Sequence, residues 1–320
     1  PSTIDVDRWT RQFAMLSLCG IGDTYSQGNP HNLNLYARPD GLVEPIPWDW
    51  DFTFSRSTSA SLWGDRNVAK LFARPVYTRM FHGHLLDIIN TTYNTAYLTG
   101  WFNHLGTVSG ENYSANLSYV TSRANFVLSQ LPTQVAFAIT SNGGADFAIN
   151  QPTTTLTGDG WINVREIFIE GVDIPLPVTW TDANSWQATL PLRPGANAFK
   201  ILATNHQDEV IGDDTITITN TGTASPANAS NLAISEIMYH PADGNQEFIE
   251  LLNLSATGTV VLSGIRFTNG IDYVFPPGTT LDPGERIVVY QSQFANGTRL
   301  SNSGEKITLV DVSGSVIADF

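Results

Sequence analysis

The segment from Glu44 to Phe54 holds the residues best suited to chemistry, because it places two aspartates in an otherwise apolar and aromatic stretch. Asp49 and Asp51 are two positions apart, and side chains at this spacing lie on the same side of an extended chain. The two carboxylates could therefore share one cation. A hard divalent ion such as Mg²⁺ prefers carboxylate and phosphate oxygens, so the pair favours a magnesium site.

Aromatic side chains alternate with these acids and suggest a second use for the segment. The aromatic residues that could form a platform for a sugar or a nucleobase are Trp48, Trp50, Phe52 and Phe54. The simpler interpretation is a hydrophobic strand that carries its carboxylates to the floor of a cleft. Trp50 lies between the two acids, so it is kept as a candidate cofactor-binding residue.

A helix must end close to these acids. Apolar residues at helical spacing predict a helix that starts after Asp5 or Asp7, runs through Leu18 and ends at Gly20. Asp23 then follows the helix end directly. The expected buried face consists of Trp9, Phe13 and Leu16.

A hairpin is expected next. Alternation predicts a strand over 32–36, and the turn residues at 38–41 lead to a return strand over 42–48. Asn32 opens this hairpin and Asp49 follows its second strand. An acid after a helix, an asparagine at the start of a hairpin and an aspartate at its end is the catalytic-loop and metal-loop arrangement of protein kinases.

Residues 5–54 resemble the CotH kinase family, the spore-coat-type secretion kinases. The resemblance rests on Gly22-Asp23, on Asn32-Leu-Asn-Leu-Tyr36 and, most specifically, on Pro47-Trp-Asp-Trp-Asp51. It extends over the first zone to about residue 130, where further helices are expected, one with Pro75 in its first turn and one over 114–131.

The resemblance implies roles for these residues. Asp23 would face the acceptor hydroxyl as a general base or orienting group, while Asn32 and Asp49 would hold Mg²⁺ on the phosphates of ATP, with Asp51 as a helper. The stretch between Asp23 and Asn32 is longer than is usual in the family. Two other asparagines, Asn29 and Asn34, therefore remain alternatives as the ligand.

A kinase also needs a glycine-rich strand and a lysine on the phosphates, upstream of this region. The sequence begins at Pro1, and its only lysines are Lys70, Lys200 and Lys306. Lys70 follows the metal motif, on the wrong side of the chain for that role. We therefore expect a kinase-like C-lobe fragment that is inactive by itself.

The spacing of apolar residues changes at Pro132 from a helical period to that of short strands. Short β-rich segments separated by turn residues predict an antiparallel sandwich over 134–222. Trp180, Trp186 and the Leu190-Pro191-Leu192 run are similar to those of bacterial immunoglobulin-like modules.

A linker over 223–230 leads to the last zone. The series 234–241, 247–251 and 275–278, followed by Leu281-Asp-Pro-Gly284, is similar to the lamin-tail domain. The resemblance implies an immunoglobulin-like β-sandwich over 231–320, truncated at its end. Glu236, Glu247 and Glu250 recur with its strand pattern and are expected to fix loops; a binding role for them stays open.

Composition excludes several classes of protein. The 320 residues carry 16 Lys and Arg against 30 Asp and Glu, a net charge of -14 that would be repelled by nucleic acid or an anionic membrane. The excess acidity lies in the two β zones. The single cysteine, Cys19, rules out an internal disulfide and is expected to be a buried thiol. No apolar run is long enough to span a membrane.

Other candidates have simpler readings. His82 and His84 point apart on a helix, so packing is favoured over metal binding. The acidic pairs Asp208-Glu209 and Asp213-Asp214 could bind Ca²⁺ in sandwich loops, although solvated turns are the favoured interpretation.

We thus expect an α+β, mainly helical fragment over 1–133 followed by two all-β sandwiches, in a monomer located outside the cell or on its surface. The leading hypothesis is Mg-ATP-dependent phosphotransfer to a protein hydroxyl in the intact protein. The alternative is a non-catalytic adhesion or scaffold protein that binds a protein, cell-surface or polysaccharide ligand. A polysaccharide hydrolase that uses Glu44, Asp49 and Asp51 ranks third, because carboxylates on one strand would flank a sugar poorly.

Overall fold

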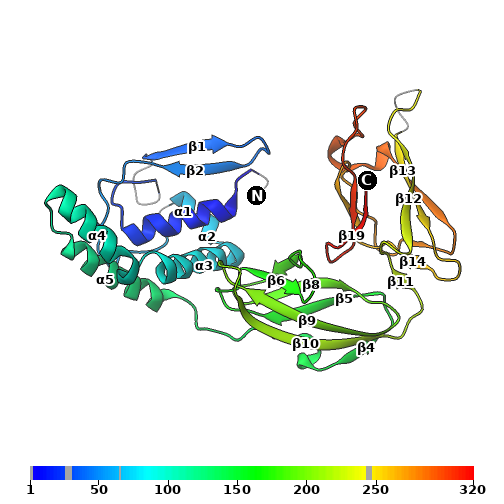
Figure 1. The fold of residues 1–320 in the computed structure, drawn as a ribbon, viewed down its shortest axis with the longest axis horizontal. Helices are drawn as coiled ribbons and strands as arrows, with labels where there is room; N and C mark the ends of the chain where they lie inside the picture. The colour runs from blue at the N-terminus through cyan, green and yellow to red at the C-terminus, as the bar shows by residue number, and fades with distance from the viewer. Residues whose placement is uncertain (1–2, 26–30, 65, 243–246) are drawn as a thin grey trace.

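A computed structural model describes residues 3–25, 31–64, 66–242 and 247–320. The chain forms a helical region, a β-sandwich and a second β region, arranged in chain order (Figure 1). Each has its own hydrophobic core, with members within 13–127, 139–218 and 227–317 respectively. The expected order of a mainly helical part followed by all-β parts is confirmed.

The first helix forms as its sequence predicts. α1 spans Val6–Cys19, and the Asp5 side chain caps it by accepting a hydrogen bond from the Arg8 amide at 3.2 Å. Gly20 ends the helix in the left-handed conformation, at φ 58°. Phe13 and Leu16 are buried on its inner face, while Trp9 is partly buried.

Four further helices follow among the described residues of this region. Pro75 opens α3 at its first turn, as expected from its fixed φ, and α3 packs along α1. A helix over 95–109, α4, was not anticipated: it carries no charged residue and buries no side chain, so its sequence lacks a clear amphipathic pattern. Its N-cap, Asn94, and the glycine that ends it, Gly110, are the local signals that predict it. The bounds are α2 Arg66–Phe72, α3 Pro75–Thr91, α4 Thr95–Ser109 and α5 Ser114–Gln130.

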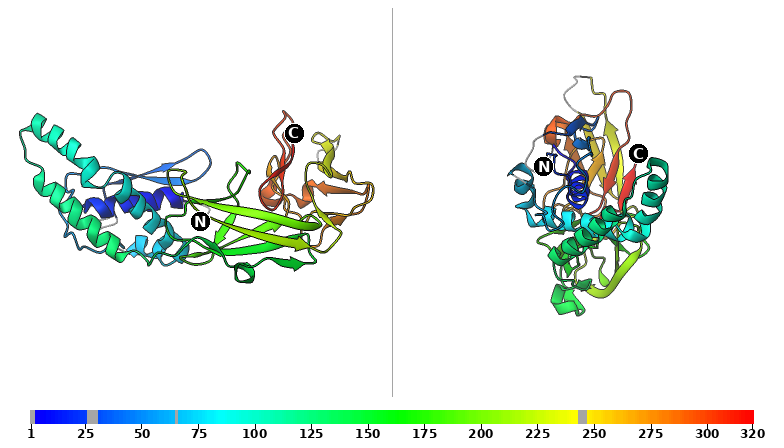
Figure 2. Two further views of the ribbon diagram at one scale, coloured as in Figure 1. Left: turned by 60° about the horizontal axis from the view of Figure 1, so that its bottom comes forward. Right: turned by 90° about the vertical axis from the view of Figure 1, so that its left-hand side faces the viewer.

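The expected hairpin lies over α1. β1, Leu33–Ala37, pairs antiparallel with β2, Val43–Pro47, so that Leu33 faces Pro47 at the end nearest the C-terminus of α1. Figure 2 shows the hairpin along one side of α1, with α4 and α5 extending away from the rest of the molecule.

Two four-stranded sheets form the sandwich. Their orders are β4-β10-β9-β6 and β3-β5-β8-β7, and all pairs are antiparallel except the pair formed by β4 and β10. Short strands are present across the zone expected to form the sandwich, and the first of them, β3, has only two residues; the immunoglobulin-like assignment of this region stays a prediction. The bounds are β3 Ala138–Ile139, β4 Phe147–Ile149, β5 Thr153–Asp159, β6 Glu166–Ile169, β7 Val178–Trp180, β8 Ser185–Pro191, β9 Gly195–Thr204 and β10 Val210–Asn220.

A buried arginine joins the helical region to the sandwich. Arg79 of α3 is 5% exposed, and its guanidinium carbon lies 3.3 Å from the centroid of the Trp180 ring. The same guanidinium donates hydrogen bonds to the carbonyl oxygens of Trp161, at 2.6 Å, and Val164, at 3.2 Å. Burial lowers the pKa of Arg79 to about 9. The side chain is thus a fixed cross-link between the two units.

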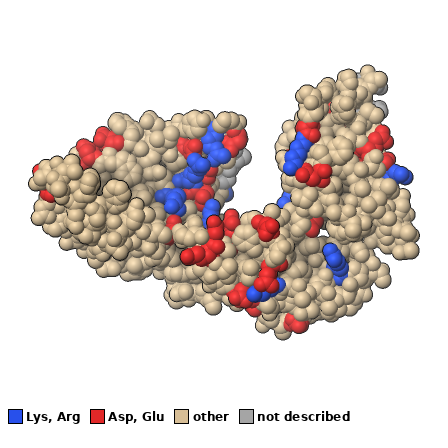
Figure 3. Space-filling view, viewed as in Figure 1, with Lys and Arg blue, Asp and Glu red and all other residues tan. Residues whose placement is uncertain are grey.

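In the last region, the residues that the structure describes form three three-stranded sheets, ordered β11-β14-β16, β12-β13-β17 and β15-β18-β19. The turn at Gly314 lies against Ile174 and Pro177 of the sandwich. A wide gap separates this region from the helical one above the sandwich (Figure 3). The bounds are β11 Ser225–Pro226, β12 Leu232–Met238, β13 Phe248–Asn253, β14 Val260–Val261, β15 Arg266–Asn269, β16 Thr280–Leu281, β17 Arg286–Tyr290, β18 Thr308–Val310 and β19 Val316–Asp319.

Candidate functional site

The site is built on the C-terminal end of α1. The Cys19 carbonyl accepts a hydrogen bond from the Phe54 amide at 2.7 Å, and the Gly20 carbonyl accepts one from Arg56 at 3.1 Å. Helix ends leave carbonyl groups without intrahelical partners, and here the segment that follows Asp51 satisfies two of them. We call the segment 49–54, which carries Asp49 and Asp51, the acidic turn. These hydrogen bonds fix it against the end of the helix that Asp23 follows.

Asn32 connects the two parts of the site. It is 6% exposed, and its Nδ2 donates to the Asp23 carbonyl oxygen at 2.8 Å. Its own carbonyl accepts a hydrogen bond from the Trp48 amide at 3.2 Å, just after β2. Asn32 adopts φ 59°, a left-handed conformation that asparagine tolerates better than most residues. An asparagine at this position therefore holds both acidic segments together.

Asp23 lies beside His31. The His31 Nε2 is 2.9 Å from Asp23 Oδ1, and both side chains are accessible to solvent. This contact was not predicted, because neither residue belongs to a motif that couples them. It orients the Asp23 carboxylate at the surface of the site.

The two aspartates come together by a different geometry from the one expected. β2 ends at Pro47, Asp49 adopts φ 59°, and a turn follows it, so the prediction of an extended segment across both acids is wrong. Their side chains nevertheless meet. Although Asp49 is exposed, neighbouring groups displace part of its water and raise its pKa; the charge of Asp51, a hydrogen bond with Asp51 and the charge of Asp23 add to that rise.

These donors suit a hard cation. Two carboxylates and a buried amide with a fixed orientation are oxygen ligands of the kind that Mg²⁺ accepts together with phosphate oxygens. Across the described residues, no three His, Cys, Asp or Glu side chains gather closely enough to hold a metal by themselves. Asn32 would therefore complete the set with its Oδ1. Asn34 lies on β1, two residues further along, and Asn29 falls outside the described residues.

Trp50 lines a separate groove of about 600 Å³ between α1 and the hairpin. Arg8 and Arg11 also line this groove, together with Glu44. Arg8 forms an ion pair with Glu44, so this carboxylate is already committed to a structural contact. The contact weakens the hydrolase reading, which needs Glu44 as a catalytic acid.

The remaining candidates have structural roles. Cys19 is buried, and burial raises the pKa of its thiol to about 12. His84 is 1% exposed and lies 2.9 Å from Asp7, whereas burial lowers the pKa of His82 to about 4. Both histidines are packed, as expected.

One of the two acidic pairs that were expected to lie in Ca²⁺-binding loops does not lie in a loop. Asp213 and Asp214 lie within β10 rather than in a loop, and Asp214 accepts a hydrogen bond from the Ile139 amide at 2.7 Å. At the other, Glu209 accepts one from Asn205 at 2.9 Å. Two of these four side chains are thus engaged in hydrogen bonds within the sandwich.

Arg123 is a positioning residue that sequence reasoning missed. It is 1% exposed on α5 and donates to the carbonyl oxygens of Ser17, at 2.9 Å, and Ala60, at 2.6 Å. Burial lowers its pKa. It ties α1 to the segment that follows the acidic turn. The available signal was a charged residue between Val120 and Val127, on the apolar face of a predicted helix.

Within the last region, Glu247 fixes a loop as expected. It is 6% exposed and accepts a hydrogen bond from the Leu300 amide at 2.9 Å. Glu250 contacts Arg286 at 3.0 Å and accepts a hydrogen bond from Ser235 at 2.7 Å. None of the described helices is long and apolar enough to cross a membrane.

Two solved structures show weak similarity to this chain. The endo-β-1,4-mannanase of Thermotoga petrophila shares 9% identity at a TM-score of 0.23, covering 34% of this chain and 24% of that one. SGBP-B, from the mixed-linkage glucan utilization locus of Bacteroides ovatus and bound to a heptasaccharide, shares 16% identity at a TM-score of 0.19, covering 58% and 40%. The chain thus spans less than half of either structure, and both similarities are weak. No curated protein sequence matches the chain.

Family comparisons are decisive for the two ends of the chain. Residues 1–134 match the family described as CotH kinase protein, and residues 225–320 match the Lamin Tail Domain. Both matches agree with the resemblances carried by Pro47–Asp51 and by the motif series after residue 231. The chain therefore combines a CotH kinase region with a lamin tail domain, and a β-sandwich joins them.

Proposed function

We propose that the CotH region supplies the acceptor-binding and metal-binding half of a phosphotransfer site that uses Mg²⁺ and ATP. Asp23 would orient the acceptor hydroxyl of a protein, and Asn32 and Asp49 would hold Mg²⁺ with help from Asp51. When bound, the ion would neutralise charge on the transferred phosphoryl group. Trp50, in its separate groove, is a weaker candidate for contact with the nucleotide.

The observation that supports this proposal most strongly is the link between Asn32 and Asp23 beside the pair formed by Asp49 and Asp51. Residues from the end of α1, the start of β1 and the turn after β2 are brought into one place. Partial loss of water raises the pKa of Asp49, and the charges of Asp51 and Asp23 raise it further; a divalent cation would offset those charges.

Metal binding is tested first, with Mn²⁺ as a spectroscopic substitute for Mg²⁺. We expect Asp49→Asn to weaken Mn²⁺ binding by about 10-fold or more, measured by electron paramagnetic resonance. Asp173→Asn is the matched control, because Asp173 is an exposed aspartate in a sandwich turn. Equal affinities for Mn²⁺ in the two variants would contradict the assignment of Asp49.

Phosphotransfer is tested with γ-labelled ATP and protein acceptors, using this chain and any longer natural form of it. Asp23→Asn is expected to lower the transfer rate by about 100-fold while leaving Mn²⁺ affinity nearly unchanged. This difference separates acceptor orientation from metal binding. Transfer that persists in both Asp23→Asn and Asp49→Asn would reject the proposal.

A second candidate is a non-catalytic scaffold or adhesion protein outside the cell. It is favoured by the share of the chain in β regions, since residues 134–320 form two of them and carry most of the excess acidity. Pull-down with cell-wall and plant polysaccharides tests this candidate. Absence of retention on all of them would count against a carbohydrate ligand.

A further inference from the structure

A small pocket lies at the junction between the helical region and the sandwich. It is formed where α3 lies beside the turn between β9 and β10 (Figure 1), and it measures about 170 Å³. The loop between β5 and β6 and the beginning of β10 complete its wall. We refer to this space as the junction pocket.

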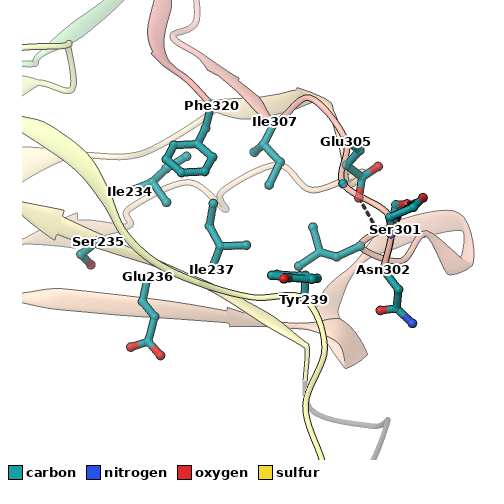
Figure 4. Close-up of a pocket in the computed structure, with 13 residues that line it drawn as sticks. Ile234, Ser235, Glu236, Ile237, Tyr239, Ser301, Asn302, Glu305, Ile307 and Phe320 are labelled. Atoms are coloured by element: carbon teal, nitrogen blue, oxygen red, sulfur yellow. Dashed lines mark hydrogen bonds between the residues drawn. The ribbon is translucent and has the colours of Figure 1, made fainter.

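The side chains of the junction pocket differ from those of a larger pocket in the lamin tail domain. That pocket measures about 580 Å³, and Ile234, Ile237 and Ile307 point into it (Figure 4). The junction pocket is lined mainly by polar groups instead. Its amide side chains are those of Asn90, Asn163, Asn205 and Gln207. An amide group both donates and accepts hydrogen bonds, so this lining suits a ligand that does the same.

Gly83 of α3 lets the sandwich come close enough to form the pocket. A Cβ atom at this position would lie 2.7 Å from the Ile162 carbonyl oxygen and 3.8 Å from His206 Nε2. Because glycine has no Cβ, the loop that carries Ile162 can lie directly against the helix. In the same loop, the Trp161 indole nitrogen donates a hydrogen bond to the Pro132 carbonyl oxygen at 3.0 Å. These contacts fix the loop side of the pocket.

The turn between β9 and β10 is held in place by its own hydrogen bonds. The Asn205 side chain accepts hydrogen bonds from the backbone amides of Gln207, at 2.9 Å, and Glu209, at 3.0 Å. Gln207 Nε2 then donates to Asp87 Oδ1 of α3 at 2.6 Å. The turn is therefore tied to the helix across the pocket, and a ligand would find the wall already ordered.

The one carboxylate of the junction pocket is already neutralised. Asp87 is 7% exposed, and its Oδ2 forms an ion pair with Arg11 at 3.0 Å while its Oδ1 accepts the hydrogen bond from Gln207. Burial, and then the charge of His84, lowers the pKa of His206 to about 4, so this imidazole is neutral at pH 7. The pocket thus offers no free charge to an ionic ligand, and a neutral ligand is favoured.

Several polar groups of the pocket remain available to a ligand. Among the residues that the structure describes, the side-chain amides of Asn90 and Asn163 have no hydrogen-bond partner, and neither has the ring of His206. Gln207 Oε1 is a further acceptor, since only the nitrogen of that amide is engaged. The apolar side chains of the wall are Leu86, Trp161 and Ile211. Donors, acceptors and apolar surface therefore meet around one small space.

We propose that the junction pocket binds one neutral sugar residue of a saccharide. A pyranose ring presents hydroxyl groups, which donate and accept, together with apolar C–H groups, and this matches the amides and the apolar side chains of the wall. A volume of about 170 Å³ is below the ~300 Å³ at which sites for drug-sized ligands begin, so the pocket suits a single ring. The proposal deepens the second candidate function, on which it rests, and does not depend on phosphotransfer.

The test is a nuclear magnetic resonance titration of the complete 320-residue chain, labelled with ¹⁵N. The probes are the methyl glycosides of glucose, galactose, mannose and xylose. We expect at least one of them to shift the side-chain amide signals of Asn90 and Asn163 saturably at concentrations below about 100 mM. Cyclohexylmethanol, a six-membered ring with a single hydroxyl, is the control ligand and should bind at least about 10-fold more weakly.

Variants of the chain locate the site. Asn90→Ala and Asn163→Ala should each weaken binding of the sugar by about 3- to 10-fold, because each removes a hydrogen-bonding group. Asn103→Ala is the matched control, since Asn103 is an exposed asparagine on α4, away from the pocket. Thermal unfolding of each variant checks that the chain stays folded, and the comparison with cyclohexylmethanol uses the unchanged chain.

The proposal fails if none of the glycosides binds, if cyclohexylmethanol binds as tightly as the best of them, or if both asparagine variants keep the affinity of the unchanged chain. The polysaccharide pull-down separates these failures from failure of the second candidate function. Retention on a polysaccharide that is equal in Asn163→Ala and in the unchanged chain would keep that candidate and reject the junction pocket as its site. A glycoside bound at Asn90 and Asn163, without retention on any polysaccharide, would support the pocket and count against adhesion.

Discussion

At the scale of single residues, buried arginines hold the CotH region in place. Arg123 reaches the carbonyl groups of Ser17 and Ala60 from α5, and no bulky apolar side chain could satisfy these acceptors. A buried acceptor that loses its donor costs its full desolvation energy. The position of the acidic turn relative to α1 therefore depends on a residue that is remote in sequence from both.

Replacing Arg123 with methionine tests this dependence. We expect Arg123→Met to lower the free energy of unfolding by about 2–4 kcal/mol, because the carbonyl groups lose their donors. Arg193→Met is the control, since Arg193 is exposed in the sandwich. Urea unfolding followed by fluorescence measures the difference; an equal effect of both variants would show that Arg123 has no special role.

The aspartate pair makes a second prediction at this scale. Partial desolvation and the nearby charge of Asp51 raise the pKa of Asp49, so Asp51→Asn should lower that pKa. Protons and metal compete for the same carboxylate, and Mn²⁺ affinity of the unchanged chain should therefore increase as the pH rises through the pKa of Asp49. Nuclear magnetic resonance titration of the Asp49 side-chain carboxyl carbon checks the shift. A pKa that does not move in Asp51→Asn would show that the two groups do not interact.

At the scale of elements, the sequence predicts those helices and strands that are set by residues close together in the chain, and it misses those set by distant contacts. α1 with its cap at Asp5, the hairpin and the sandwich strands follow from short patterns, and the structure has them. α4 was missed because its uncharged sequence gives no clear period. The turn after Pro47 was predicted as extended chain, since its course is set by hydrogen bonds from Phe54 and Arg56 to the end of α1, which no local pattern reveals.

A substitution at Gly20 tests how tightly the C-terminal end of α1 is packed. Gly20 adopts φ 58°, and a Cβ atom there would lie 1.9 Å from the Tyr119 hydroxyl oxygen. Gly110 ends α4 at φ 78° with no atom within 4 Å of an added Cβ. Gly110→Ala should thus cost only the backbone strain of about 1–2 kcal/mol, whereas Gly20→Ala should cost clearly more and weaken Mn²⁺ binding. Equal losses of thermal stability would contradict the close packing at Gly20.

At the scale of the whole molecule, the junction between the helical region and the sandwich concentrates titratable groups. The His206 ring of the sandwich makes a tilted contact with the His84 ring of α3, with centroids 5.0 Å apart and an interplanar angle of 39°, and Asp87, Arg165 and Arg11 lie around it. Burial, and then the charge of His84, lowers the pKa of His206 to about 4. Burial alone would raise the pKa of Asp7, but His84 and Arg165 hold it at about 2.

These shifts predict how stability depends on pH. His82 and His206 have folded-state pKa values of about 4, below the ordinary 6.5, so the unfolded chain binds protons more readily between these values. Stability should be complete above pH 6.5 and fall as the pH drops toward 4, by on the order of 2 kcal/mol from the more buried His82. Below 3.8, protonation of Asp7 removes a further contribution.

Urea unfolding at pH 7 and pH 4.5 measures this loss. His82→Gln should reduce the dependence on pH, and His104→Gln controls for loss of an imidazole at an exposed position on α4. If His82→Gln and the unchanged chain lose the same stability between the two pH values, His82 is not the group responsible.

The stack of Arg79 on Trp180 has a mechanical consequence. Suppose that optical tweezers pull on the two ends of the chain. The force between the helical region and the sandwich would then act on the junction at Arg79, whose buried guanidinium binds the carbonyl oxygens of Trp161 and Val164. The lamin tail domain is joined to the sandwich by the short connection between Thr221, which bonds to Ile149, and Ser225, which bonds to Thr259, and the turn at Gly314 lies against the sandwich. Force traces should accordingly show two ruptures, with the helices and the sandwich giving way together and the lamin tail domain separately.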